Sequence, residues 1–161
     1  MAATIQISVS TSSGPTVTDG VTGIDMESAD NATNTLANRQ ANPITVGTSS
    51  YEKWIRLKVA TAPANGVTNF KAWGPGAAQA STTLWMTAAY VTYQQGTNAV
   101  STIANTSMAN YTSGNKATWD SASYSATGSY TKHLVLQLQV GSDCGPGNWT
   151  TETISFSYDE T

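Results

Sequence analysis

The sequence predicts an all-β fold, an antiparallel β-sandwich that is jelly-roll-like, and three observations carry this prediction. Several segments alternate apolar and polar residues with a period of two, which is typical of strands with one buried face. Gly, Pro and Asn turn signals separate these segments at fairly regular intervals. Ser and Thr make up about a quarter of the 161 residues, and the branched Cβ of Thr suits a pleated strand. Helical spacing is rare and weak, so two packed sheets explain the pattern best.

The N-terminal third is expected to hold one strand and a long polar segment. Residues 4–10, TIQISVS, alternate Ile and Val with polar residues and predict the first strand. Residues 11–50 are mostly polar and contain Gly-Pro, Asp-Gly and Asn-Pro turn signals. The apolar spacing in residues 28–40 is too thin for a stable amphipathic helix. We therefore expect 11–50 to form an extended arm or long loop, with at most one short helical turn.

The best-defined core begins at Tyr51. One face of the next strand is expected to point inward, and it carries Ile55, Leu57 and Val59. An Asn-Gly pair then precedes a strand over residues 67–73, and this pair between alternating runs predicts a hairpin. Residues 82–93 predict a long strand that is apolar on both faces. A weaker strand is expected near residues 100–103.

The C-terminal part contains the clearest strand. Residues 104–131 are polar, with Trp119 and Tyr124 as expected core anchors. The strand over residues 133–140 should direct four side chains inward: Leu134, Leu136, Leu138 and Val140. A last strand over residues 151–158 should bury Ile154, Phe156 and Tyr158. Without a linker or a composition shift, residues 1–161 are expected to form one domain.

Charge and cysteine content exclude several classes of function. Charged residues are only 11% of the chain, against about 25% in ordinary domains. The net charge is −3 and the seven Lys and Arg residues are scattered, which disfavours direct binding of nucleic acid. We expect no membrane span, because no apolar run approaches about 18 residues. The N-terminus lacks the pattern of a signal peptide, and a lone cysteine allows no internal disulfide, so folding in a cytoplasm is expected.

No residue pattern predicts catalysis or a cofactor. The single histidine, His133, is expected on the polar, solvated face of its strand, and there is no G-x-S-x-G motif. Cys144 is expected in a turn beside Asp143, whose negative charge disfavours a reactive thiolate. The Gly-rich turns lack the lysine of a phosphate-binding loop. We therefore expect no catalytic residue, no cofactor and no enzymatic activity.

Two weaker features could still bind something. Four acidic residues fall within twelve positions and are candidate calcium ligands, although they lack the spacing of an EF-hand loop: Asp19, Asp25, Glu27 and Asp30. A solvated acidic loop without a metal is the preferred interpretation. Trp73, next to a Gly-Pro-Gly turn, is the candidate for an exposed aromatic contact with a partner.

Two segments have a recognisable pattern: SSYEKWIRLKV followed by VTNFKAWG, and LVLQLQVGSDCGPGNWTTETISFSYDET at the C-terminus. Both resemble segments of small virion proteins of tailed bacteriophages. Together they cover about half of the chain. The matching residues lie in expected strands and turns, so the resemblance carries over no catalytic residue.

The resemblance implies a non-enzymatic structural role. In size and composition the chain is similar to small β-sandwich proteins that decorate and cement phage capsids. The implied partners are the major capsid protein, further copies of the chain, or both, in a homo-oligomer on the virion, which assembles in the host bacterial cytoplasm. A tail-tube or neck component is an alternative within this class. A carbohydrate- or receptor-binding β-sandwich module is an alternative of another class, since one fold hosts many functions.

Overall fold

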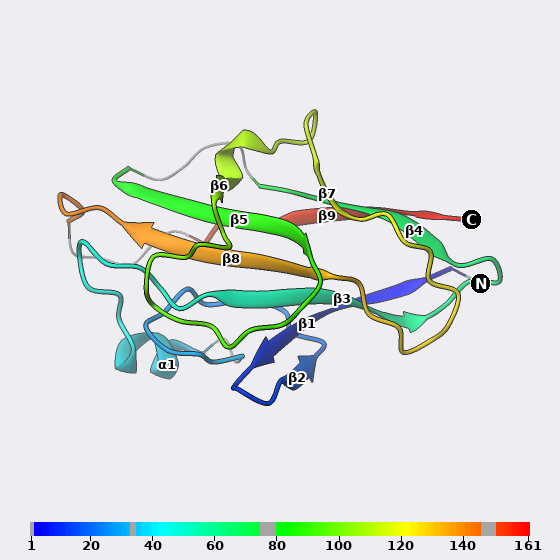
Figure 1. Cartoon of the computed structure of the whole chain (residues 1–161), viewed down its shortest axis with the longest axis horizontal. Helices are drawn as coiled ribbons and strands as arrows, with labels where there is room; N and C mark the ends of the chain where they lie inside the picture. Colours follow the sequence, from blue (N-terminus) through cyan, green and yellow to red (C-terminus); the bar gives the residue numbers. More distant parts are fainter. Residues whose placement is uncertain (1, 33–34, 75–79, 146–150) are drawn as a thin grey trace.

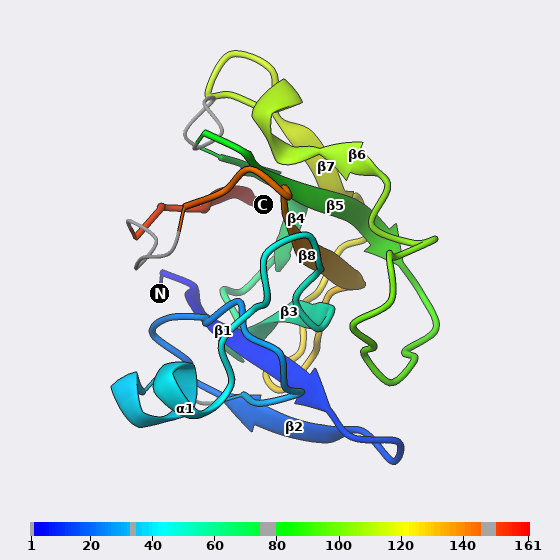
Figure 2. The same ribbon diagram turned by 90° about the vertical axis from the view of Figure 1, so that its left-hand side faces the viewer.

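The protein is an antiparallel β-sandwich, as the sequence predicts (Figures 1 and 2). The structure is a computed structural model that describes residues 2–32, 35–74, 80–145 and 151–161. In chain order, the elements are β1 (Thr4–Thr11), β2 (Thr16–Asp19), α1 (Leu36–Ala41), β3 (Lys53–Thr61), β4 (Val67–Trp73), β5 (Thr82–Tyr90), β6 (Thr106–Ser107), the 3-10 helix η1 (Met108–Asn110), β7 (Ala117–Asp120), β8 (His133–Val140) and β9 (Ser155–Glu160).

The strands divide unequally between the two sheets. Among the described residues, the larger sheet has six strands in the order β2-β1-β3-β8-β5-β6, and the smaller has three in the order β7-β4-β9. Each strand pair in this part of the chain is antiparallel. Most pairings join strands that are distant in the sequence, so the fold depends on contacts that local patterns cannot specify.

The main core lies between the two sheets, where the alternation predicts it. From the six-stranded sheet it receives Ile55, Leu57, Val59, Leu134 and Leu136. From the other side, Phe70 and Trp119 complete it, so the expected anchoring by Trp119 is confirmed. The C-terminal segment contributes three partly buried side chains, Phe156 and Tyr158 from β9 and Ile154 just before it. This core holds the two sheets together.

The connection between β3 and β4 corrects the predicted hairpin. These strands do not pair with each other, because β3 pairs with β1 and β8 while β4 pairs with β7 and β9. The Asn65-Gly66 turn instead carries the chain from one sheet to the other. Gly66 has a φ of 98°, and a Cβ there would lie 2.9 Å from the Tyr124 carbonyl oxygen. The crossover puts Val59 and Val67 on opposite walls of the same core.

A loop over residues 91–105 covers the outer face of the six-stranded sheet (Figure 1). Beneath it lies a second apolar cluster built on Trp54, Val135 and Ala104. This explains why the segment containing β5 is apolar on both faces. The strand expected at residues 100–103 is not formed, because the Ser101 hydroxyl accepts hydrogen bonds from the Ile103 amide at 3.0 Å and the Ala104 amide at 2.8 Å, and so bends the chain.

The segment 11–50 is a long loop that folds back on the domain, and the expectation of an extended arm is corrected. It contains strand β2 and helix α1, whose N-cap hydroxyl, Thr35 Oγ1, accepts from the Asn38 amide at 3.1 Å. Ile24 and Met26 pack against the main core. The loop folds back on the domain because the three-stranded sheet is narrower than the six-stranded sheet and leaves part of its inner face uncovered. The loop supplies the missing cover.

Candidate functional site

The four acidic residues that were candidate metal ligands are each engaged by the protein itself. Asp19, at the end of β2, accepts from Ser8 Oγ at 2.7 Å and from Lys58 Nζ at 2.6 Å. Burial alone would raise the pKa of Asp19, but hydrogen bonds from Lys58, Ser8 and Tyr130 outweigh it, and the pKa lies below its ordinary value. Asp19 is therefore an ionised partner within the outer face of the six-stranded sheet.

The other three candidates, Asp25, Glu27 and Asp30, also have separate partners. Asp25 pairs with Arg39 at 2.9 Å, Glu27 pairs with Lys53, and Asp30 accepts from the Ser12 amide at 2.8 Å. Within residues 2–32, 35–74, 80–145 and 151–161, no group of three or more His, Cys, Asp and Glu side chains is placed to hold a metal ion. The acidic stretch does not converge on a metal site in this part of the chain.

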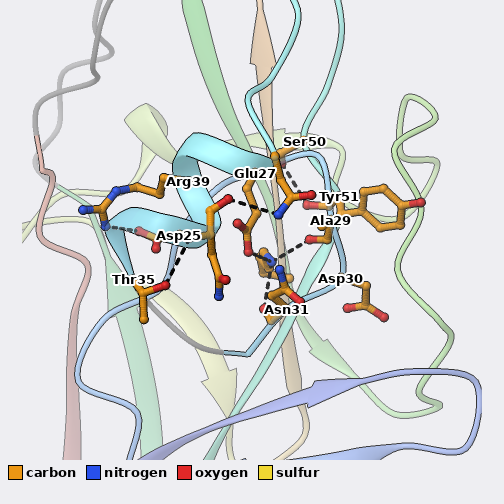
Figure 3. Close-up of polar contacts among 12 residues, drawn as sticks. Asp25, Glu27, Ala29, Asp30, Asn31, Thr35, Arg39, Ser50 and Tyr51 are labelled. Carbon is orange, nitrogen blue, oxygen red and sulfur yellow. Dashed lines mark hydrogen bonds and ion pairs between the residues drawn. The ribbon is translucent and has the colours of Figure 1, made fainter.

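A buried lysine, Lys53, is the centre of this region instead, and Figure 3 shows its partners Glu27, Ala29 and Asn31. Lys53 and Glu27 each have a side chain that is only 1% exposed, and Nζ lies 3.5 Å from Glu27 Oε1. The same ammonium donates to the carbonyl oxygens of Ala29 at 3.0 Å and Asn31 at 2.8 Å. The loop is also tied by the Tyr51 amide, which donates to the Glu27 carbonyl at 2.9 Å. Lys53 thus fixes residues 27–31 on the end of β3.

Burial dominates the electrostatics of Lys53. It lowers the pKa of the ammonium below its ordinary value, while the charges of Glu27, Asp30 and Asp25 act in the opposite direction. No sequence motif marks this residue as part of a site. Side chains alternate between the two faces of a strand, so Lys53 lies on the same face as Ile55 and Leu57. A lysine on the core face of a strand was the one feature of the sequence that could have predicted its burial.

Trp73, the candidate partner contact, is partly buried at the end of β4. The Lys116 ammonium lies 4.4 Å from the centre of its ring, a cation–π distance. The neighbouring Ala72 lies in the core, so Trp73 projects on the opposite, outer face of the three-stranded sheet. Part of its ring surface is thus covered by this chain. The turn that follows it, at residues 75–79, and the second Gly-Pro-Gly turn with Trp149 lie outside the described residues.

His133 is buried rather than solvated, which corrects the expectation from the sequence. It is 5% exposed and lies edge-on to Trp54, with ring centroids 5.5 Å apart. Its Nε2 is 3.5 Å from Ser10 Oγ, while Nδ1 is buried and has no hydrogen-bond partner in the described part of the chain. Burial, helped by the charge of Arg56, lowers its pKa to about 4.

The arrangement around His133 does not support nucleophilic catalysis. A serine–histidine pair normally needs a carboxylate that orients the second ring nitrogen. Here no carboxylate among the described residues is hydrogen-bonded to Nδ1, and Ser10 is 1% exposed, so its hydroxyl is buried away from solvent. The histidine is part of the packing of the second apolar cluster. Cys144 is half-buried in a turn closed by its own amide, which donates to the Gly141 carbonyl at 3.2 Å.

A second polar network fixes the loop over residues 91–105. Gln137 is fully buried and its amide group donates to the carbonyls of Ser50 at 3.0 Å and Ala99 at 2.7 Å. Its side-chain oxygen accepts from the Ser101 amide at 2.8 Å, and the Ser101 hydroxyl donates to Glu52. These bonds satisfy polar groups beneath the loop, so the network is structural.

Comparisons with known proteins identify no family for this chain, so it is classified by its fold alone. No protein-family model matches the chain, and no curated protein or solved structure matches it. No helix among the described residues is long and apolar enough to cross a membrane. The chain is an all-β sandwich protein whose charged and titratable side chains mostly serve its own fold.

Proposed function

We propose that this chain is a non-enzymatic structural protein of a tailed-phage virion, and that it decorates and cements the capsid. The partners in this proposal are the major capsid protein and further copies of the chain, in a homo-oligomer on the particle. Binding of nucleic acid or membrane is not part of it. The proposal combines the resemblance of the strand and turn segments with the way the fold uses its charges.

One observation carries the proposal: the fold already uses most of its basic side chains. Six of the seven Lys and Arg residues contact a carboxylate or an aromatic ring of the same chain, namely Arg39, Lys53, Arg56, Lys58, Lys116 and Lys132. Because charged residues are only 11% of the chain, the surface outside these contacts carries few ions. Such a surface can be buried against another protein without removing water from many ions, which would be costly.

A cement protein needs this kind of surface because its task is to add buried interface. A subunit that bridges neighbouring capsomers stabilises the shell without any chemical step. The two loops that cover the six-stranded sheet, residues 20–52 and 91–105, give the domain broad irregular surfaces in addition to its sheet edges. Loops on a rigid scaffold are where binding surfaces usually lie.

Labelling of intact particles tests where on the virion the protein is located. We expect gold-conjugated antibody against this chain to mark the faces of the head in electron micrographs. Label confined to the tail or neck would replace the decoration role by the tail-tube or neck alternative. Particles from a strain that lacks the gene serve as the control for the antibody.

A second candidate, a carbohydrate- or receptor-binding module, rests on Trp73. Its ring lies on the outer face of a sheet next to a lysine, and aromatic rings of this kind can stack on sugars. Binding on a glycan array that is lost in Trp73→Ala and kept in Val91→Ala would favour this candidate over the capsid role.

A further inference from the structure

We propose that Lys53 and Glu27 form a covalent side-chain amide in the mature folded protein. The two side chains lie 26 positions apart in the sequence and meet where the long loop closes over the end of β3. This inference concerns a modification of the chain itself. It does not rest on a role in the virion, and it can fail or succeed independently of that role.

Burial puts the amine and the carboxyl group in conditions that favour the reaction. Both side chains are 1% exposed, and Glu27 Oε2 is buried without a hydrogen-bond partner in the described residues. Transfer of one proton from the Lys53 ammonium to the carboxylate within this buried contact gives the neutral amine and acid, which are the reactive forms. Burial lowers the pKa of Lys53, which is the direction that favours this transfer.

The contact geometry of Nζ also fits a nucleophile. Its two short hydrogen bonds go to main-chain carbonyls, Ala29 at 3.0 Å and Asn31 at 2.8 Å. After one proton has moved to the carboxylate, these two carbonyls can hold the hydrogens that remain on the amine. Its contact with Glu27 is the long one, at 3.5 Å from Oε1. The amine nitrogen therefore contacts the carboxyl group whose carbon it would attack, with Oε1 as the nearer atom.

The reaction is a condensation that needs no second reactant. A bond forms between Nζ of Lys53 and Cδ of Glu27, and one bond from Cδ to oxygen breaks. The departing oxygen leaves as water with one hydrogen from the amine and one from the carboxylic acid. The amide keeps one N–H, which can donate to the carbonyl of Ala29 or Asn31. Two charges disappear from the core, and the loop between residues 27 and 53 becomes closed by a covalent link.

The mass of the full-length folded protein tests the proposal. We expect the intact mass to be lower than the sequence mass by one water molecule. Trypsin should fail to cleave after Lys53, because its side chain is an amide, and digestion should yield a branched fragment that joins residues 1–39 to residues 40–56. The full sequence mass, with free fragments ending at Lys53, would overturn the proposal.

Two controls separate this amide from other losses of water. The Lys53→Arg variant cannot form the amide and should have its full mass; a loss of water that persists in this variant would come from another site and would overturn the proposal. The Lys58–Asp19 pair provides a matched control within the wild-type chain. Its atoms are closer, at 2.6 Å, but its side chains are 26% and 29% exposed, so they remain charged and should stay unlinked.

Discussion

Individual buried side chains set most of the stability of this sandwich. Leu136 is 1% exposed and lies in the core cluster with Leu57 and Phe70. Truncation to Ala removes contacts that the surrounding sheets cannot fully replace, and we expect Leu136→Ala to cost about 2–5 kcal/mol of unfolding free energy. Chemical denaturation measures this loss. Val91→Ala is the matched surface control, since Val91 is 72% exposed and its loss should change stability by about 0.5 kcal/mol at most.

The buried imidazole of His133 predicts a dependence of stability on pH. Its pKa is lowered from 6.5 to about 4, so the unfolded chain binds its proton more readily than the folded one. The stabilisation is full above about pH 6.5 and is lost as the pH falls towards 4, by up to about 3 kcal/mol. We expect unfolding curves to show this decline. His133→Phe should flatten it between these limits; an equal slope in both proteins would contradict the assignment.

At the scale of the elements, the contact between Lys53 and Glu27, whether an ion pair or the proposed amide, holds the long loop on the sheet. Glu27→Ala leaves a buried lysine without its partner, which typically costs about 3–5 kcal/mol. We expect this variant to be cleaved by protease within residues 20–50 much faster than the wild type. Lys58→Ala, which breaks an exposed pair, should cost only about 0–1 kcal/mol and leave the cleavage pattern unchanged.

Strands with one buried face were predictable, because the alternation of apolar and polar residues can be read from a short stretch of sequence. The residues of β3, β4 and β8 are therefore almost those expected from the alternation. Strand partners are not local, and the turn at Asn65-Gly66 looks like a hairpin turn although it joins two sheets. The burial of His133 depends on a loop contributed by residues 91–105, which no pattern around the histidine could show.

The candidate site was predictable only in part for the same reason. The acidic stretch from Asp19 to Asp30 is visible in the sequence, but the partner of each carboxylate comes from another segment. Lys53 could have been placed on the core face from its phase with Ile55. Its pairing with Glu27 depends on how the loop folds back, and this is fixed by the unequal width of the two sheets.

For the whole molecule, the sparse and internally paired charge gives a surface that other proteins can cover at low electrostatic cost. If the chain cements a capsid, its binding rests on apolar burial and backbone contacts rather than on ion pairs. Exposed pairs contribute about 0–1 kcal/mol each, and at 1 M salt the Debye length falls to about 3 Å. Burial of apolar surface does not depend on that screening.

We therefore expect particles to keep this protein when the NaCl concentration is raised from about 0.05 M to about 1 M, since the screening affects only exposed charges. Mild denaturant should release it, because denaturants weaken apolar burial and solvate peptide groups. Sedimentation of particles followed by quantification of bound protein measures both effects. Release by salt alone would contradict this account and point to a contact steered by charge. The Asp19→Asn variant would then be the first to examine, because Asp19 is only partly covered by Lys58 and Tyr130.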